Sequence, residues 1–363
     1  MYKILIILIV LFFGFSIITA QIKDENSKQD TSLKQTTYSE SLPYEPHRFR
    51  QKDKKPKKDS NSKKSEPSDD AIPETAVKIP VFVLDGKENP VNYLQKADFK
   101  VFADNAEQEI VAFETAKTGR NILLVVDTSP SIAYKDDDLR KFVGEMTKAL
   151  QPGDKIQIVK FNEVPEILSE PTNDPLVLQK ALKKIKIGDG TSIYDSMQII
   201  YRKYLKTVAE KPVIILVTDG VDTTSQRTDY ISSLVLAEES GAVVFPFYFD
   251  SYESFQKNQL PILLGSPFPR PQSGIDREEY EIGRAYLKDI AALSGGKTYN
   301  IEKFADIKKE DFEAVFKFIN PQYYLSIKRA ENTGAFERKQ IKVRVNRPNL
   351  SVQARGSYVT GKD

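Results

Sequence analysis

The amino-acid sequence predicts an α/β fold, in which a three-layer, doubly wound and mostly parallel sheet is inserted in a small antiparallel β-sandwich. Three observations predict it. The run from Ile122 to Val126 is continuously apolar, as expected of a strand that is buried on both faces. Strands and helices alternate through the middle of the chain, which implies parallel βαβ units. Shorter, alternating strand patterns flank that region at 76–117 and 321–360.

The composition narrows the classes of function. The chain has 363 residues and is 40% hydrophobic, enough for a sizeable core, and its formal net charge of +2 gives no reason to expect nucleic acid as a partner. It has no cysteine, which excludes disulfides, zinc thiolate sites and a cysteine nucleophile. The one histidine, His47, lies in a polar tract, which argues against Ser-His-Asp chemistry.

The first 75 residues fall into two segments. Residues 1–20 carry one charge, Lys3, before an apolar stretch that ends near Ala20. This pattern favours an export signal over an N-terminal membrane anchor, because a spanning helix needs about 20 apolar residues. Residues 21–75 are rich in lysine and serine and bury too little apolar surface to fold, so we predict a disordered linker. Its lysine cluster at 52–64 is expected to be solvated, with contact to an anionic membrane or polymer as the alternative.

The remaining elements follow in chain order. The first part of the β-sandwich, 76–117, has strand patterns at 77–83, 99–102 and 110–113. The α/β domain, 118–320, has strand patterns at 122–126, 156–161, 164–168, 213–217, 243–249 and 297–301. Its helices are predicted at 139–150, 176–187, 191–204, 225–240, 280–293 and 306–319. The second part of the sandwich, 321–360, has strand patterns at 324–327, 341–345 and 352–358.

Oxygen-bearing side chains follow the predicted sheet strands at three places. Asp127, Ser129 and Ser131 follow the first strand, Thr191 follows a Gly-Asp-Gly turn, and Asp219 follows the third fully apolar strand. Open α/β sheets bind their ligands at the carboxyl ends of the strands. Carboxylates and hydroxyls suit Mg²⁺, Mn²⁺ or Ca²⁺. We therefore predict that these five residues bind one divalent cation.

The same three segments resemble a known family. Asp-Thr-Ser-Pro-Ser at 127–131, Gly-Thr-Ser-Ile-Tyr-Asp at 190–195 and Val-Thr-Asp-Gly at 217–220 are similar to the metal-ion-dependent adhesion site of von Willebrand factor type A domains, in the same order. The resemblance covers 118–320. It implies that the two serines and the threonine contact the metal directly, and that the two aspartates often act through water. In the flanking segments, Asn-Tyr-Leu-Gln-Lys-Ala-Asp-Phe at 92–99 and Arg-Gly-Ser-Tyr at 355–358 resemble a bacterial, exported subgroup of related proteins.

These patterns and the resemblance together predict an exported, non-enzymatic protein that binds other proteins. A site with few protein ligands leaves the ion one position toward solvent, and neutral hydroxyls offset its charge poorly. An acidic residue of a partner protein should therefore bind the ion strongly. Nucleic acid is not expected, and membrane contact is expected only through an N-terminal anchor. The predicted location is the periplasm, the cell surface or the medium.

Two other functions stay open at this point. A metal-dependent hydrolase or phosphatase would use an aspartate nucleophile, but it would want a second carboxylate where Ser129 stands, and no histidine is available as a base near the site. An envelope scaffold would use the metal only for stability. The resemblance also implies open and closed states in which the last helix, 306–319, moves.

Several residues also have a plain structural interpretation. The hydroxyl residues of the site could serve as helix caps, and Asp219 could favour a helix dipole. We expect Asp222 to be a turn or cap residue and Asp189 to be a loop residue that binds no metal. A long surface insertion is predicted at 251–279, which is rich in proline, glycine, serine and glutamine. Three tyrosines are assigned to the core of the β unit rather than to a carbohydrate-binding surface: Tyr323, Tyr324 and Tyr358.

Overall fold

A computed structural model of the chain describes residues 38–41, 76–115, 119–131, 136–205, 212–252, 277–302, 304–319, 321–330 and 337–360. All of them belong to one compact unit, Thr36–Asp363. The predicted export signal, the lysine cluster and most of the insertion lie outside the described residues. None of the helices in the described stretches combines the length and the apolar character that a membrane crossing requires.

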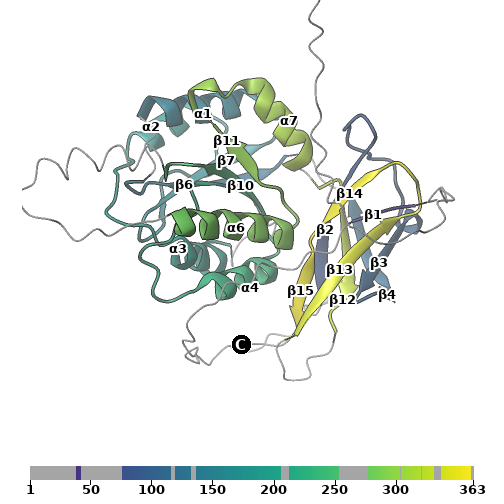
Figure 1. Cartoon of the computed structure of the whole chain (residues 1–363). Coiled ribbons are helices and arrows are strands. Elements are labelled where there is room, and N and C mark those ends of the chain that lie inside the picture. The colour runs from purple at the N-terminus through teal and green to yellow at the C-terminus, as the bar shows by residue number, and fades with distance from the viewer. Residues whose placement is uncertain are drawn as a thin grey trace, which may run out of the picture. The chain divides into compact units, whose positions relative to one another are not determined.

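A six-stranded sheet forms the centre of the α/β domain (Figure 1), and its strand order is β11-β10-β9-β6-β7-β8. All its neighbours are parallel except β7 and β8, which confirms the predicted mostly parallel sheet. From β6 the chain builds outward to β8 on one side, and from β9 it builds to β11 on the other. The strand bounds are β6 Asn121–Asp127, β7 Lys155–Phe161, β8 Glu166–Ile167, β9 Val213–Thr218, β10 Val243–Phe249 and β11 Tyr299–Ile301.

Helices cover both faces of this sheet, because alternate residues of β6 point to opposite sides. Leu124 packs in a core with α1 (Asp136–Lys148), α2 (Pro175–Leu182) and α7 (Lys309–Ile319). Its neighbour Val125 packs in a second core on the other face. That core includes α3 (Ile193–Ile199), α4 (Tyr230–Ser240) and α6 (Arg277–Ser294) (Figure 1). The three-layer prediction is thereby confirmed.

The sandwich consists of two antiparallel sheets, and both parts of the chain that flank the α/β domain contribute to each. One sheet has the order β14-β2-β12-β5, and the other has β1-β13-β3-β4 with β15 also on β13. Tyr323 and Tyr358 are buried in its core, whereas Tyr324 is half-buried beneath the Lys78 ammonium group. The strand bounds are β1 Ser39–Glu40, β2 Ala76–Leu84, β3 Phe99–Ala103, β4 Ala106–Gln108, β5 Ile110–Thr115, β12 Tyr323–Lys328, β13 Glu337–Val345, β14 Ser351–Ala354 and β15 Ser357–Thr360.

Two predictions for the flanking segments are wrong in part, the first of them only at residues 39–40. The linker predicted as disordered over 21–75 contains β1, which pairs with the end of β13. The single strand predicted at 352–358 is two strands, because the chain turns toward the α/β domain between them. There the Gly356 amide donates to the carbonyl oxygen of Ala292 in α6.

Three predicted helices are shorter than expected. The helix predicted at 176–187 ends at Leu182, and the amide of Gly188 beyond it donates to the Thr128 carbonyl. The helix predicted at 225–240 begins at Tyr230, since Asp229 caps it by accepting from the Ser232 amide. The helix predicted at 306–319 begins at Lys309, after a 3₁₀ turn at Phe304–Asp306. The first of these helices is thus followed by a tertiary hydrogen bond, whereas the second begins at a local cap and the third after a local turn.

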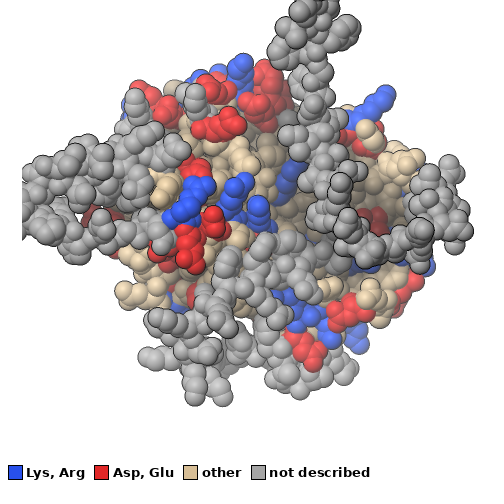
Figure 2. Space-filling view, in the orientation of Figure 1, with Lys and Arg blue, Asp and Glu red and all other residues tan. Residues whose placement is uncertain are grey.

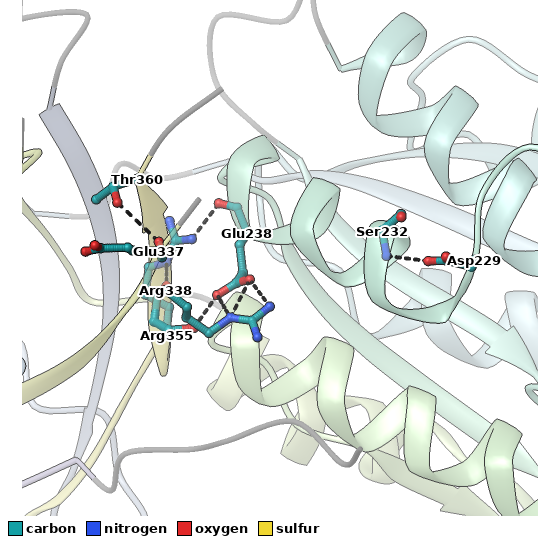
Figure 3. Close-up of polar contacts among 8 residues, drawn as sticks. Asp229, Ser232, Glu238, Glu337, Arg338, Arg355 and Thr360 are labelled. Carbon is teal, nitrogen blue, oxygen red and sulfur yellow. Dashed lines mark hydrogen bonds and ion pairs between the residues drawn. The ribbon is translucent and has the colours of Figure 1, made fainter. Parts of the chain in front are cut away.

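Polar contacts join the sandwich to α4 of the α/β domain (Figure 3). The fully buried side chain of Glu238 accepts from Nη2 of Arg338 on β13 at 2.8 Å, and the Ser357 hydroxyl donates to the same carboxylate. Arg355 donates to the carbonyl oxygen of Glu238. A buried carboxylate is tolerated only with such partners, so these contacts specify how α4 meets the sandwich.

Candidate functional site

The two predicted aspartates lie at adjacent strand ends in the middle of the sheet. Asp127 ends β6 and Asp219 directly follows β9, and these strands are the pair at which the strand order reverses. Such a reversal point is the usual ligand site of an open α/β sheet. The Thr218 hydroxyl donates to Oδ2 of Asp127 at 2.6 Å, so β9 holds the carboxylate at the end of β6.

The two serines lie between these aspartates. The Ser129 amide donates to Oδ1 of Asp127 at 2.9 Å, which turns the chain back after the strand. This turn brings the Ser129 and Ser131 hydroxyls within 3.1 Å of each other. The Ser131 hydroxyl also lies close enough to the Asp219 carboxyl to lower the pKa of that group. Four of the five predicted ligands therefore form one connected group.

Thr191 is brought to the same edge by its backbone. Its carbonyl accepts from the amides of Thr223 and Thr224 at 2.8 and 3.0 Å, which ties it to the loop after Asp219. At the other end of its loop, Gly188 donates to Thr128 at 2.9 Å. The three loops thus converge, while the described hydrogen bonds of Thr191 involve its backbone groups rather than its hydroxyl.

The electrostatics of the aspartate pair follow from its burial. Burial raises the pKa of the Asp127 carboxyl from 3.8 to about 7, and the charge of Asp219 adds to this effect, while the Thr218 and Ser129 hydroxyls oppose it. Burial also raises the pKa of Asp219, against hydroxyl donors from Ser251 and Ser131. Two buried carboxylates of like charge are unfavourable together, and a bound proton or cation relieves the repulsion.

The site is more enclosed than the sequence predicts. All five side chains are 0–4% exposed, although Pro130 between the serines is exposed. These side chains therefore do not by themselves leave the cation the solvent-facing coordination position that the sequence predicts. The segments that directly follow Ser131 and Tyr252 in the chain, 132–135 and 253–276, lie outside the described residues.

Two residues near the site organise its loops. Asp195, at the end of the Gly-Thr-Ser-Ile-Tyr-Asp segment, accepts from three successive backbone amides at 226–228. Asp222 accepts from the Tyr194 and Ser225 amides and from the Ser225 hydroxyl, as expected of a turn residue. The side chain of Asp189 is exposed.

Sequence reasoning missed two supports of the loop that carries Asp219. The Ser251 hydroxyl donates to Oδ2 of Asp219 at 2.7 Å, so the first residue of the predicted insertion belongs to the site. Ser251 lies at the carboxyl end of a parallel strand, as Asp127 and Asp219 do, and this position could have indicated that it belongs to the site. Gly220 has a φ of +78°, and a Cβ on Gly283 in α6 would lie 2.6 Å from the Gly220 carbonyl carbon. This close contact between sequence-distant backbones has no local signal.

The donor set fits a hard divalent cation. It offers two carboxylates with raised pKa and three hydroxyls, oxygen ligands of the kind that Mg²⁺ and Ca²⁺ prefer. No group of three or more His, Cys, Asp or Glu side chains is placed to hold a metal within the described stretches. A cation here would therefore depend on the hydroxyls, as the sequence predicts.

Comparison with known proteins identifies the domain. Residues 122–221 match the family model of the von Willebrand factor type A domain. Among curated proteins, the chain is 23% identical over 212 residues to a UPF0353 protein of Mycobacterium avium and 24% identical over 214 residues to one of Mycobacterium leprae. Each alignment covers 52% of this chain and 57% of the relative, so the chain spans little more than half the length of these relatives.

Solved structures resemble the chain only generally. An aerotolerance-related membrane protein from Bacteroides fragilis has a TM-score of 0.39 and 16% identity, covering 55% of this chain and 98% of that one. Proximal thread matrix protein 1 from the mussel byssus, with a zinc-occupied MIDAS motif, has a TM-score of 0.39 and 15% identity, covering 60% and 49%. The family model carries the assignment, because it spans the segments with Asp127, Thr191 and Asp219: the chain contains a von Willebrand factor type A domain.

Proposed function

We propose that the chain is an exported, non-enzymatic binding protein whose von Willebrand type A domain holds a divalent cation and binds an acidic residue of a partner protein through it. The observation that carries the proposal is the meeting of three loops around two buried carboxylates at the reversal point of the sheet. A bound Mg²⁺ would supply positive charge that attracts a carboxylate from outside.

The chain's own residues would divide the work at this site. Asp127 and Asp219 would supply the negative charge that retains a cation, and the hydroxyls of Ser129, Ser131 and Thr191 would supply neutral oxygens. Thr218 and Ser251 hold the two carboxylates in place by hydrogen bonds of 2.6 and 2.7 Å. Because three of the five ligands are neutral, the cation's charge would stay incompletely offset, and an acidic group would be preferred over a neutral one.

Recognition in this proposal is local. On the described part of the face in Figure 2, basic and acidic side chains are interspersed rather than gathered by sign. In this proposal the attraction comes from the ion itself, and salt would screen it beyond a short range. Since the five side chains are 0–4% exposed, a partner's carboxylate would need neighbouring segments to shift before it could reach the ion.

Calorimetric titration with Mg²⁺ tests the metal site. Ser129→Ala and Asp219→Ala are expected to lose Mg²⁺ binding while keeping a cooperative thermal transition. Ser326→Ala is the matched control, because Ser326 is a fully buried serine of β12 in the sandwich. Binding by both site variants at the wild-type affinity would refute the assignment.

Capture of partners from the envelope of the source cell, with and without chelator, tests the function. The proposal expects partners that are released by chelator and are not captured by Asp219→Ala. A partner that is retained in chelator would favour the scaffold. Hydrolysis of phosphoesters that Mg²⁺ supports and Asp127→Asn abolishes would favour the hydrolase.

A further inference from the structure

The short strand β1 lies on an edge of the sandwich that is otherwise half covered. One edge of β13 pairs with β3, and its other edge pairs with β15 over 337–340. β1 pairs with the opposite end of that second edge, with Ser39 beside Val345 and Glu40 beside Arg344. Uncovered strand edges are sites at which extended segments add to a sheet.

Two serine hydroxyls of this segment satisfy backbone groups of the sandwich. The Ser39 hydroxyl donates to the Arg347 carbonyl at 2.8 Å and accepts from the Leu350 amide at 3.0 Å. The Ser41 amide donates to the Val343 carbonyl at 2.8 Å, and the Ser41 hydroxyl accepts from the Val343 amide at 2.9 Å. Without the segment, these four sandwich groups would lose their partners.

Arg344 contacts the two other side chains of the segment, those of Tyr38 and Glu40. The Arg344 guanidinium lies 4.0 Å from the centre of the Tyr38 ring and 4.9 Å from that of Phe102. It also pairs with the Glu40 carboxylate at 3.1 Å, with Lys342 at 3.8 Å from the same group. The contacts therefore depend on the order aromatic, hydroxyl, acid, hydroxyl, and not only on an extended backbone.

We propose that Val343, Arg344, Arg347 and Leu350 form a strand-docking site, and that its occupant is the chain's own segment 38–41. Long polar sequence surrounds the segment in the chain, and the next described residue after Ser41 is Ala76. Four residues bind weakly by themselves, so the covalent connection supplies the effective concentration that keeps the site filled. Segment 38–41 is thus held on the sandwich by contacts that involve none of the five predicted metal ligands.

The test uses the full chain with residues 38–41 replaced by glycine, and a fluorescent peptide of residues 36–43 (Thr-Thr-Tyr-Ser-Glu-Ser-Leu-Pro). Fluorescence anisotropy is expected to show saturable binding to the glycine variant. Binding to the wild-type chain should be at least about tenfold weaker, because its own segment competes. Adding Arg344→Ala to the glycine variant should weaken binding by about tenfold, through loss of the ring and ion-pair contacts.

Lys339→Ala, added to the glycine variant, is the matched control on β13, because Lys339 pairs with Asp104 and Glu337 at the other end of the strand. It should leave peptide binding unchanged. The proposal is overturned if wild type and glycine variant bind the peptide equally, or if a folded glycine variant shows no binding up to about 1 mM peptide. Should the glycine variant not fold, Ser41→Ala in the full chain must speed hydrogen exchange of the Val343 amide, and an unchanged rate would overturn the proposal.

Discussion

The Ser251 hydroxyl lies 2.7 Å from Oδ2 of Asp219 and 3.0 Å from the Tyr280 hydroxyl. Ser251 follows β10 and Tyr280 lies in the first turns of α6. One hydrogen-bonded chain thus connects two further elements of the domain to a proposed metal ligand. Residues that touch no ion themselves can set ligand orientation and metal affinity in this way.

Ser251→Ala is expected to weaken Mg²⁺ binding by about tenfold or more, because a hydrogen bond to a charged group contributes about 1.5–3 kcal/mol. Tyr280→Phe should have a smaller effect in the same direction, since it removes only the partner of Ser251. Calorimetric titration measures both, with Ser326→Ala as the control. Wild-type affinity in a folded Ser251→Ala protein would show that the contact does not position Asp219.

Mg²⁺ affinity is expected to fall as the pH is lowered. Protons compete with the metal for Asp127, whose pKa is raised from 3.8 to about 7 by burial and by the Asp219 charge. Affinity should fall by roughly tenfold per pH unit below about 7 and level off above it. Titrations between about pH 5.5 and 8.5 would measure this dependence, and a constant affinity over that range would contradict it.

The same raised pKa makes the folded, metal-free protein more stable at low pH than at high pH, which is opposite to the pH dependence of Mg²⁺ affinity. The folded-state pKa of Asp127 lies above the unfolded value, so the folded state binds the extra proton. Its stabilising contribution is complete below about 4 and is lost as pH rises toward about 7. Mg²⁺ should therefore raise the melting temperature more at pH 8 than at pH 5.5. An equal effect at both pH values would argue against Asp127 as a ligand.

Gly283→Ala is expected to destabilise the domain and weaken Mg²⁺ binding together. The new Cβ would lie 2.6 Å from the backbone of Gly220, which must move and would shift the adjacent Asp219. Overpacking of this kind costs about 1–3 kcal/mol. Gly144→Ala in α1 is the matched control, because its nearest neighbour would be a glutamine side-chain nitrogen at 3.9 Å.

Urea unfolding and Mg²⁺ titration of the two glycine variants provide the comparison. Gly144→Ala should keep or slightly raise stability, by up to about 1 kcal/mol, since alanine favours a helix over glycine. If Gly283→Ala behaved like Gly144→Ala in both measurements, the close packing of α6 on the Asp219 loop would be refuted.

Asp154→Asn is expected to lower the free energy of unfolding by about 3 kcal/mol. Asp154 pairs with Arg120, and both side chains are buried, at 1% and 7% exposure. Arg120 also donates to the Phe316 carbonyl of α7 at 3.0 Å, so the pair holds the last turns of that helix. Removing one partner leaves an uncompensated buried charge.

Glu313→Gln provides the control for this prediction, because Glu313 pairs with Lys309 at a half-exposed position and should contribute less than about 1 kcal/mol. Urea unfolding should separate the two variants clearly.

The movement of α7 between open and closed states stays a prediction. If it occurs, Arg120→Ala should alter partner affinity, and an unchanged affinity would count against it.

Much of the candidate site was predictable because its residues are local to strand ends. Asp127 and Asp219 each follow an apolar strand, and parallel strands place such residues at one sheet edge. The same reasoning could have included Ser251, but its proline- and glycine-rich continuation suggested a surface insertion. Asp195 was also within reach, since it closes a recognised segment, but its three amide partners lie about thirty residues away.

Other features had no local signal. The glycine contact beneath Asp219 joins α6 to the end of β9, and neither segment reveals it alone. The tract around β1 has the composition of a disordered linker, yet Ser39 and Ser41 find four backbone partners on the sandwich. The helix predicted from residue 225 also begins later, at Tyr230, because the amides of residues 226–228 bond the distant Asp195 carboxylate.

The sequence by itself determined the layered α/β domain, the two-part sandwich and the three polar segments of the site. Hydrophobic periodicity and the polar residues at strand ends are both properties of residues that are adjacent in the chain. Only the tertiary structure decided how enclosed the five oxygen-bearing side chains are and which neighbouring residues hold them by hydrogen bonds. It also decided that Tyr38–Ser41 completes a sheet edge. Those features depend on close contacts between distant segments, and such contacts are set by packing and hydrogen-bond satisfaction over the whole chain.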